Sequence, residues 1–201
     1  MIFGINGQIA AGKDETGRRI INMLPGGTTY RKIAYADMLK LSFRAFFNIS
    51  DEQLELLKRE DNAFIEIHSL YDGGVGQVHS RMSFREALQR FGTEAHRKVF
   101  GQSFWVDMTF PPDYKEKYDM TVVCDVRFPD EAERIKELGG KIIRVLDGPL
   151  KESDHPSEQI FPDSMIDYEI ENSTRDDDFS NLDKQIRKVL EKENIFVRET
   201  A

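Results

Sequence analysis

Short apolar runs alternate with helical patterns along most of the chain, which is the order expected of a protein built on a parallel sheet. Five short apolar runs bounded by turns, loops or helical patterns predict strands over residues 1–6, 30–36, 121–124, 141–146 and 166–170. Apolar positions three or four residues apart predict helices over 13–24, 130–138 and 182–190 and a helix through Leu39, Phe43 and Phe46. The polar run Ser50-Asp51-Glu52 predicts the start of another helix. We therefore expect an α/β fold with a mainly parallel central sheet, flanking helices and right-handed crossovers.

The best-patterned helix begins at Ser83. Ser83 and Glu86 have the spacing of a capping box, which stabilises the first turn of a helix. One apolar stripe follows, formed by Phe84, Leu88, Phe91, Ala95 and Val99. A polar stripe runs beside it, formed by Arg85, Gln89 and Thr93. We expect this polar stripe at the margin of the core, where the wall of a binding cleft would lie.

Two segments lack a clear pattern. Between residues 61 and 82 the apolar positions are isolated and a glycine-rich stretch occupies 73–76. We therefore expect a single domain that carries an insertion or loop at about residues 48–82. Residues 148–162 form a polar stretch between the last two predicted strands, and we expect a loop there.

The composition is that of a globular protein. The chain has 201 residues, of which 39% are hydrophobic and 32% charged, enough for one domain with a sizeable core. Its 36 acidic and 28 basic residues give a net charge of −8, which argues against general nucleic-acid binding but allows a nucleotide in a local basic pocket. Cys124 is the only cysteine and the four histidines are far apart, which excludes a disulfide framework and a recognisable zinc motif.

The N-terminal residues and the apolar runs bear on location. MIFGINGQ has neither the basic region nor the long apolar region of a signal peptide, and no run approaches the ~18 apolar residues of a membrane span. We therefore expect a cytoplasmic protein without a membrane partner.

Residues 7–16, GQIAAGKDET, match a phosphate-binding loop of the form G-x-x-x-x-G-K-[ST], except that Asp14 replaces the Ser or Thr that helps to hold Mg²⁺. A strand is predicted before this loop and a helix after it, as the motif requires. Small residues let backbone N–H groups approach phosphate oxygens, and Lys13 would reach the β- and γ-phosphates. The alternative is a glycine turn that enters a helix, with Asp14 as an acidic residue of the first turn.

Asp125 and Arg127 directly follow a predicted buried strand. In open α/β sheets, ligands bind beyond the carboxyl ends of the strands, so both residues are candidates for a site. The alternatives are surface salt bridges for Arg85 and Arg127, and a cap of the following helix for Asp125.

Four blocks of the sequence resemble the deoxynucleoside monophosphate kinases of tailed bacteriophages in their order and approximate spacing. The blocks are GQIAAGKDET, SFREALQRFGTEAHRKVFGQSFWVD, VVCDVRFPDEAERIKELGGKIIRV, and HPSEQ followed by DYEIEN. The resemblance covers the chain except residues 48–82 and the tail after about residue 190. The combination of R-x-x-x-Q-x-x-G-T, Phe-Trp and D-x-R-F-x-x-E is far more specific than the phosphate-binding loop. Loops that end in G-K-D are usual in this family, so Asp14 departs from the general motif but not from that of the family.

The resemblance implies a P-loop nucleoside-monophosphate-kinase-like three-layer sandwich. It implies the ATP-dependent phosphorylation of deoxynucleoside monophosphates to diphosphates, with Mg²⁺ as the metal. The implied partner is a small-molecule substrate and not a nucleic acid, and a homodimer is an open option. The expected location is the cytoplasm, that of the host cell if the protein is phage-encoded.

The resemblance also carries over site residues, position by position. It implies contacts with ATP at Gly7, Ala10, Gly12, Lys13, Asp14, Glu15, Thr16 and Asn172. It implies contacts with the acceptor at Leu39, Lys40, Arg85, Gln89, Gly92, Thr93, Trp105, Asp125, Arg127 and Glu131. The candidate Mg²⁺ ligands are Asp14 and Asp125, and the candidate catalytic residues are Lys13, Arg85, Asp125 and Arg127. Two purely structural alternatives stay open: Lys40 as an ordinary exposed lysine of a helix, and Trp105 as a side chain of the core.

Related kinases carry a mobile lid where residues 148–162 lie. This stretch offers Lys151, His155 and Glu158 but no arginine, whereas lids usually bring arginines to the transferring phosphate. Arg144 or Arg97 could supply that charge instead.

Two other functions are compatible with the phosphate-binding loop. One is another small P-loop kinase, of the dephospho-coenzyme A or shikimate type, against which the coupled R-x-x-x-Q-x-x-G-T and D-x-R-F motifs argue. The other is a protein that binds nucleotide without turning it over, which ATP binding without ADP release would identify.

Overall fold

The computed structural model divides into two compact units. The sheet unit comprises Met1–Tyr35 and Phe110–Ala201, and the insert unit comprises Ala36–Thr109. Across both units, the residues that the structure describes are 1–8, 10–59, 64–70, 77–147, 161–172 and 178–197. Among the helices in these ranges, none combines the length and the apolar character needed to cross a bilayer.

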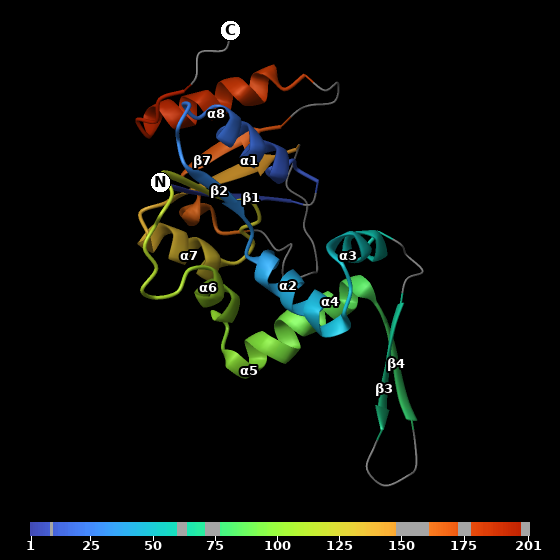
Figure 1. The fold of residues 1–201 in the computed structure, drawn as a ribbon. Coiled ribbons are helices and arrows are strands. Elements are labelled where there is room, and N and C mark those ends of the chain that lie inside the picture. Colours follow the sequence, from blue (N-terminus) through green and yellow to red (C-terminus); the bar gives the residue numbers. More distant parts are fainter. Residues whose placement is uncertain (9, 60–63, 71–76, 148–160, 173–177, 198–201) are drawn as a thin grey trace. The chain divides into compact units, whose positions relative to one another are not determined.

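Five parallel strands form the sheet unit's central sheet, as the alternating pattern predicts (Figure 1). The strands are β1 (Ile2–Gly7), β2 (Tyr30–Ile33), β5 (Met120–Val123), β6 (Lys141–Leu146) and β7 (Tyr168–Glu171). Their order across the sheet is β2-β5-β1-β6-β7, so β1 lies at the centre. Gly4 of β1 is paired with Val123 on one side and with Ile142 on the other. Because the strands are parallel, all their carboxyl ends lie at one edge.

Helices cover both faces of this sheet and complete the expected three-layer sandwich. Helices α1 (Lys13–Asn22) and α8 (Ser180–Lys192) pack on one face, and α7 (Pro129–Glu137) packs on the other (Figure 1). A short 3₁₀ turn, η3 (Asp163–Met165), precedes β7. Alternate strand residues fill the core beneath α1 and α8, with Phe3, Ile5, Val122, Val145 and Ile170 among its buried members.

Glycines allow the helices to lie close to the sheet. A Cβ added at Gly4 would lie 2.7 Å from Ile135 Cδ1 of α7, and one added at Gly17 would lie 2.5 Å from Cys124 Sγ. Because Gly17 belongs to the second turn of α1, its close approach holds the start of this helix against the sheet. The buried Cys124 is therefore a packing residue of the core.

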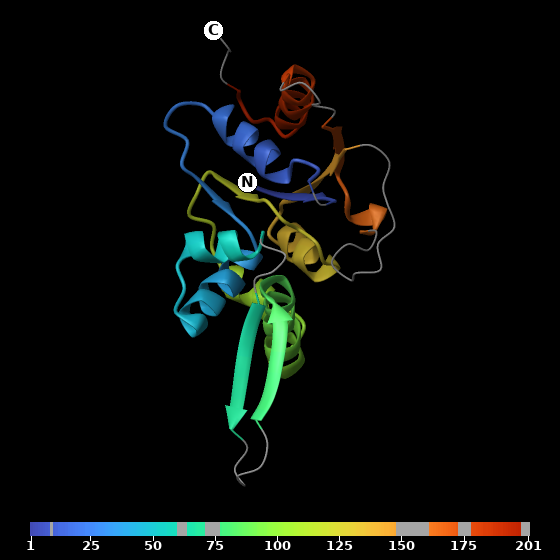
Figure 2. The ribbon, with the colours of Figure 1, turned by 90° about the vertical axis from the view of Figure 1, so that its right-hand side faces the viewer.

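The insert unit consists of helices and one antiparallel hairpin (Figure 2). Its helices are α2 (Ala36–Phe47), α3 (Asp51–Leu57), α4 (Phe84–Gly92), α5 (Lys98–Phe100) and α6 (Phe104–Thr109). Ser50 begins α3 with a complete capping box, and the Ser83 hydroxyl caps α4 by accepting from the Glu86 N–H at 3.2 Å. An apolar cluster joins these elements and includes the buried residues Phe43, Leu54, Ile65, Met82 and Leu88.

The hairpin corrects the sequence-based expectation for this part of the chain. Strands β3 (Phe64–Leu70) and β4 (Gln77–Ser83) pair where a patternless insertion or loop was expected over residues 61–82. A strand shows a strict apolar–polar alternation only where one of its faces is buried. The apolar positions in these two strands are isolated, so their pairing left no clear pattern in the sequence. The insertion expected at about 48–82 lies within the insert unit.

A π-helical turn corrects the apolar stripe predicted after Ser83. The turn, η1 (Thr93–Arg97), follows α4 directly and uses hydrogen bonds one residue wider than those of an α-helix. The extra residue rotates the following side chains out of phase with the preceding ones. Leu88 is buried as predicted, but Ala95 is exposed and Val99 is 66% exposed.

Candidate nucleotide-binding site

The predicted phosphate-binding loop connects the carboxyl end of β1 to the start of α1. Its backbone takes left-handed conformations at Ala10, with φ 64°, and at Gly12, with φ 88°. The Lys13 ammonium donates to the carbonyl oxygens of Gly7 and Gln8, both at 2.8 Å. The first bond of the helix runs from the Thr16 N–H to the Gly12 carbonyl at 2.9 Å. Two carbonyl oxygens of the loop therefore bind its own lysine, and the loop lies between a strand and a helix, as the motif requires.

Both glycines of the loop are required by close packing. A Cβ at Gly7 would lie 2.7 Å from the Val145 carbonyl oxygen. A Cβ at Gly12 would lie 2.1 Å from Asn172 Nδ2, and the positive φ of Gly12 would strain any other residue. The two positions that define the motif in the sequence are thus sterically fixed.

Asp125 lies beside this loop, where β5 ends. Its Oδ1 is 3.9 Å from Lys13 Nζ, and both of its oxygens accept from Arg127 Nε at 2.9 Å. The side chain of Asp125 is 19% exposed, so the carboxylate is partly shielded while two cations flank it. The N-cap of α7 is Phe128, so Asp125 does not cap that helix. Lys13, Asp125 and Arg127 thus form one charged cluster at the sheet edge, which we call the edge cluster.

Glu131 holds the backbone of this segment. Its Oε2 accepts from the N–H groups of Arg127 at 2.8 Å and of Phe128 at 3.1 Å, and the residue is 3% exposed. The sequence pointed to Glu131 as an acceptor contact. In the structure its carboxylate shapes the loop that carries Asp125 and Arg127.

The acidic residues at the start of α1 have different surroundings. The Asp14 side chain is 86% exposed and pairs with Lys32 Nζ of β2 at 2.9 Å. Glu15 accepts from Arg18 and Arg19. Burial by itself would raise the pKa of Glu15, but the hydrogen bonds and charges of the two arginines outweigh it and hold this pKa below its ordinary value. Glu15 is therefore engaged within its own helix, whereas Asp14 extends into solvent.

The donor set of the site fits Mg²⁺. Among the described residues, no group of three or more His, Cys, Asp or Glu side chains converges on one point. Mg²⁺ usually keeps several waters and binds through one or two carboxylates together with substrate phosphates. Asp125 beside the loop, with Asp14 on the first turn of α1, supplies carboxylates of that kind.

Asn172 follows β7 and reaches the phosphate-binding loop. Its N–H donates to the Leu146 carbonyl at 2.7 Å, and its side-chain Nδ2 donates to the Ala11 carbonyl at 2.9 Å. The residue is 7% exposed. Thr16 of the same loop region is fully buried, and its hydroxyl has no hydrogen-bond partner among the described residues.

The insert unit carries the remaining predicted acceptor residues. The side chains of Arg85, Gln89 and Thr93 are exposed, as the polar stripe predicts. A Cβ at Gly92 would lie 3.1 Å from Leu39 Cδ2, so these two residues pack directly on each other. Whether these residues contact an acceptor stays a prediction.

Trp105 and Lys40 are both engaged inside the insert unit. Trp105 is 4% exposed, and its Nε1 donates to the Gly92 carbonyl at 3.1 Å. Its ring packs with those of His96 and Phe104, which agrees with the core alternative. Lys40 Nζ lies 3.3 Å from Glu55 Oε1 and so joins α2 to α3.

Arg144, one of the two arginines that the sequence offered in place of a lid arginine, is hydrogen-bonded within the sheet unit. Arg144 is 3% exposed and donates to Asp163 at 2.5 Å, to Glu169 at 3.1 Å and to the Phe161 carbonyl at 2.6 Å. It therefore fastens η3 to the sheet. Arg97 is buried in the insert unit. The predicted lid residues Lys151, His155 and Glu158 lie outside the described residues.

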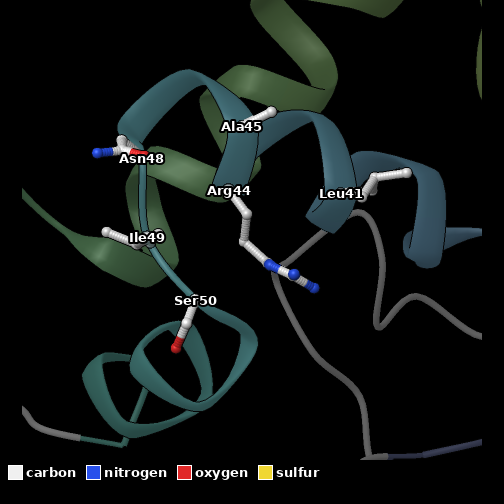
Figure 3. Close-up of a pocket in the computed structure, with 6 residues that line it drawn as sticks. All are labelled: Leu41, Arg44, Ala45, Asn48, Ile49 and Ser50. Carbon is white, nitrogen blue, oxygen red and sulfur yellow. The ribbon is translucent and has the colours of Figure 1, made fainter.

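A hollow of about 350 Å³ lies in the insert unit, between the end of α2 and the start of α3 (Figure 3). It is lined by Leu41, Arg44, Ala45, Asn48, Ile49 and Ser50. None of the site residues predicted from the sequence lines it.

Two residues of the edge region were missed by the sequence analysis. Asn6 is buried and donates from Nδ2 to the Val126 carbonyl at 2.9 Å, which ties the end of β1 to the segment after β5. The available signal was a polar residue at the end of an apolar strand. Lys32, the partner of Asp14, had no local signal.

Comparisons with known proteins bear on this site. A model of the family described as deoxynucleotide monophosphate kinase matches residues 30–186. A deoxynucleoside-5'-monophosphate kinase of Escherichia phage T5 is 31% identical over 113 residues, which cover 52% of this chain and 44% of the phage protein. A putative deoxynucleotide monophosphate kinase of Acanthamoeba polyphaga mimivirus is 29% identical over 167 residues, which cover 79% of this chain and 80% of the viral protein.

The match with the phage T5 protein thus spans less than half of the length of that relative. The family model, in contrast, spans most of this chain, including β5, the D-x-R-F segment and β7. The chain belongs to the deoxynucleotide monophosphate kinase family.

Proposed function

We propose that the protein transfers the γ-phosphoryl group of ATP to a deoxynucleoside 5′-monophosphate, which yields ADP and the deoxynucleoside diphosphate. The observation that carries the proposal is the edge cluster of Lys13, Asp125 and Arg127, which lies against a strand–loop–helix turn of phosphate-binding form. Family membership supports the choice of acceptor.

The loop supplies the donor half of this proposal. Phosphoryl transfer demands little covalent chemistry from a protein, and catalysis comes from positioning and from stabilising charge. Backbone N–H groups at the start of α1 would bind the phosphates of ATP, helped by the positive end of the helix. Lys13 would turn from the carbonyls of Gly7 and Gln8 to the phosphate oxygens, a short movement for a flexible side chain.

A bound Mg²⁺ neutralises phosphate charge and holds the phosphate oxygens in one arrangement. Asp125 is our candidate for the direct or water-mediated ligand, because its carboxylate is partly shielded beside the loop. Asp14 is the second candidate, and its exposed position suits a contact through water.

Arg127 is the acceptor-side candidate of the sheet unit. Only its Nε is bound to Asp125, and its two Nη groups make no hydrogen bond to another described residue. A guanidinium can bind two oxygens of a monophosphate at once through the parallel N–H groups of its planar fork, whereas an ammonium acts as a point charge. Arg85 is the corresponding candidate on the exposed stripe of α4.

An ADP-release assay tests the proposal directly. Mg·ATP is combined with each deoxynucleoside and ribonucleoside monophosphate in turn, and with dephospho-coenzyme A and shikimate as acceptors of other small P-loop kinases. We expect ADP release with one or more deoxynucleoside monophosphates. Release with only dephospho-coenzyme A or shikimate would assign another kinase activity. ATP binding without release in any mixture would identify a nucleotide-binding protein that is not an enzyme.

A further inference from the structure

The phosphate-binding loop has a backbone that needs support from outside. Ala10 and Gly12 both have positive φ, with only Ala11 between them. A left-handed conformation at a residue other than glycine costs free energy and persists only where neighbouring structure holds it. Left-handed residues separated by one residue of ordinary φ can turn successive N–H groups toward one point, which makes a concave site for an anion.

Asn172 provides a contact at the centre of this loop. Its Nδ2 donates to the carbonyl of Ala11, the residue between the two left-handed positions, at 2.9 Å. The same nitrogen lies so near Gly12 that a Cβ there would be 2.1 Å away. Asn172 thus donates a hydrogen bond to the loop and also fills the space beside the Cα of Gly12.

The sheet fixes Asn172 in turn. The Asn172 N–H donates to the Leu146 carbonyl at 2.7 Å, which continues the pairing of β6 and β7 by one residue. The side chain is 7% exposed, so water does not readily replace its bond to Ala11. The pairing of β6 and β7 therefore holds Asn172 in place, and the side-chain amide of Asn172 in turn holds the Ala11 carbonyl of the loop.

We infer that Asn172 is a positioning residue that holds the phosphate-binding loop in its anion-binding shape, and that it acts through the Ala11 carbonyl and not by a side-chain contact with the nucleotide. This inference deepens the proposed function and rests on it for the identity of the ligand. A loop already held in its binding shape loses less conformational entropy when it binds phosphates, so its affinity for ATP is higher.

Substitutions of Asn172 separate this role from general stability. Asn172→Ala removes the donor, and Asn172→Asp places an acceptor oxygen against the Ala11 carbonyl at almost unchanged volume. We expect the KM for ATP and the Kd for inorganic triphosphate to rise about 3- to 10-fold in Asn172→Ala, the size expected for one buried hydrogen bond, and further in Asn172→Asp. The KM for the deoxynucleoside monophosphate should stay within about twofold, since the loop belongs to the donor half. Asn181→Asp is the matched control, because Asn181 is an exposed residue of α8.

A double substitution tests the contact itself. Gly12→Ala should weaken triphosphate binding strongly, because the new Cβ would collide with Asn172 Nδ2. In that background, Asn172→Ala removes the collision and should improve binding, which is the opposite of its effect on the unsubstituted protein. Additive losses would show that the two residues do not act through one contact.

Calorimetric titration with inorganic triphosphate in the absence of acceptor keeps this test separate from the kinase assay. Asn172→Ser, which keeps a small polar side chain, replaces Asn172→Ala if circular dichroism shows that the alanine variant does not fold. A lowered Tm with unchanged triphosphate binding would overturn the inference, as would an equal rise of both KM values. A wild-type protein that binds triphosphate but phosphorylates no monophosphate would instead refute the proposed function and leave the role of Asn172 standing.

Discussion

Lys13 is the residue on which the edge cluster depends. Its ammonium bonds to two carbonyls of its own loop and lies 3.9 Å from Asp125, with only 12% of the side chain exposed. In such a partly enclosed place a positive charge acts on phosphates more strongly than it would in bulk water. The loop can fold without ligand because its own carbonyls satisfy the ammonium.

Lys13→Ala should abolish most turnover and leave the fold intact. Loss of one preorganised charge costs on the order of 10²–10³ in kcat, and the lysine makes no contribution to the apolar core. ADP release and far-UV circular dichroism measure the two effects, with Lys188→Ala on the exposed face of α8 as the control. Wild-type turnover in a folded Lys13→Ala protein would contradict the assignment of the phosphate-binding loop.

Asp125→Asn should raise the Mg²⁺ concentration needed for half-maximal activity more than Asp14→Asn does. Asp125 is shielded beside Lys13, whereas Asp14 is 86% exposed and pairs with Lys32. The N-cap of α1 is Gly12, so a purely structural Asp14 would act through the helix dipole, by about 0.3–1 kcal/mol, and through its exposed pair with Lys32. Magnesium titrations of both variants, with Asp113→Asn as an exposed control, decide the order. An unchanged titration for Asp125→Asn would remove Asp125 from the metal site.

At the scale of single residues, the candidate site residues that could be predicted from the sequence belong to short local motifs. The glycines, Lys13 and the D-x-R-F segment are recognisable because their spacing along the chain creates their geometry. Contacts between distant residues could not be predicted, such as those of Asn172 with Ala11 and of Lys32 with Asp14. They depend on strand order, which one sequence does not specify.

Among the elements, those with a buried face were the predictable ones. The five parallel strands and α1, α7 and α8 were all expected, and for all of them except β2, whose residues are exposed or half-buried, burial on the sheet imposes the apolar pattern. The hairpin β3–β4 and the π-helical turn η1 were not expected. A hairpin needs no strict apolar alternation, and a π turn shifts the helical phase without a residue type that marks it.

A salt bridge joins Lys40 of α2 to Glu55 of α3, and its contribution to stability can be tested by varying the pH. Glu55 accepts from Lys58 at 2.9 and 3.0 Å and pairs with Lys40 at 3.3 Å. The hydrogen bond from Lys58 lowers the pKa of Glu55, burial opposes it, and the charge of Lys40 adds to the lowering. A carboxylate with a lowered pKa stabilises the fold fully above its unfolded value of 4.5, and this stabilisation is lost as pH falls through the folded value.

Glu55→Gln should therefore destabilise the insert unit at pH 7 and have little effect once the pH lies below the lowered pKa of Glu55. The side chain is 39% exposed, so solvent screening limits the loss to about 0.2–1 kcal/mol. Urea unfolding is followed by the fluorescence of Trp105, the only tryptophan, which is buried in the insert unit. Glu191→Gln in α8 is the control. An equal loss at pH 7 and at the acid end would show that the charge of Glu55 contributes nothing.

On the scale of the whole molecule, the chain leaves the sheet unit and returns to it at one place. Tyr35 and Phe110, the last residue before the insert unit and the first after it, are both buried, and their rings meet edge to face at 5.9 Å. The first boundary lacks the Gly-, Pro- or Ser-rich composition of a linker, whereas Pro111 and Pro112 directly follow the second. Composition thus gives no signal at the first boundary, and the insertion expected at about residues 48–82 stays a prediction.

The predicted donor loop lies in the sheet unit and the predicted acceptor arginines lie one in each unit, and kinetics can separate donor from acceptor residues. Lys13 and the loop lie in the sheet unit, and Arg85 lies on the exposed stripe of α4 in the insert unit. If Arg85 binds the acceptor phosphate, its substitution changes the KM for the monophosphate and leaves the KM for ATP unaltered. The same holds for Arg127, whose Nη groups are not engaged by other described residues.

Arg85→Lys and Arg127→Lys should each reduce kcat/KM for the deoxynucleoside monophosphate, with the KM for ATP within about twofold of the wild-type value. Lysine keeps the charge but loses the planar fork, and a lost charge-assisted hydrogen bond costs about 1.5–3 kcal/mol. Arg90→Lys is the matched control, since Arg90 lies on the same helix and is paired with Glu86 at 2.8 Å. Initial rates over a grid of both substrate concentrations give the two KM values independently. If both variants bind ATP more weakly and use the monophosphate normally, the arginines belong to the donor site and the acceptor is bound by other residues.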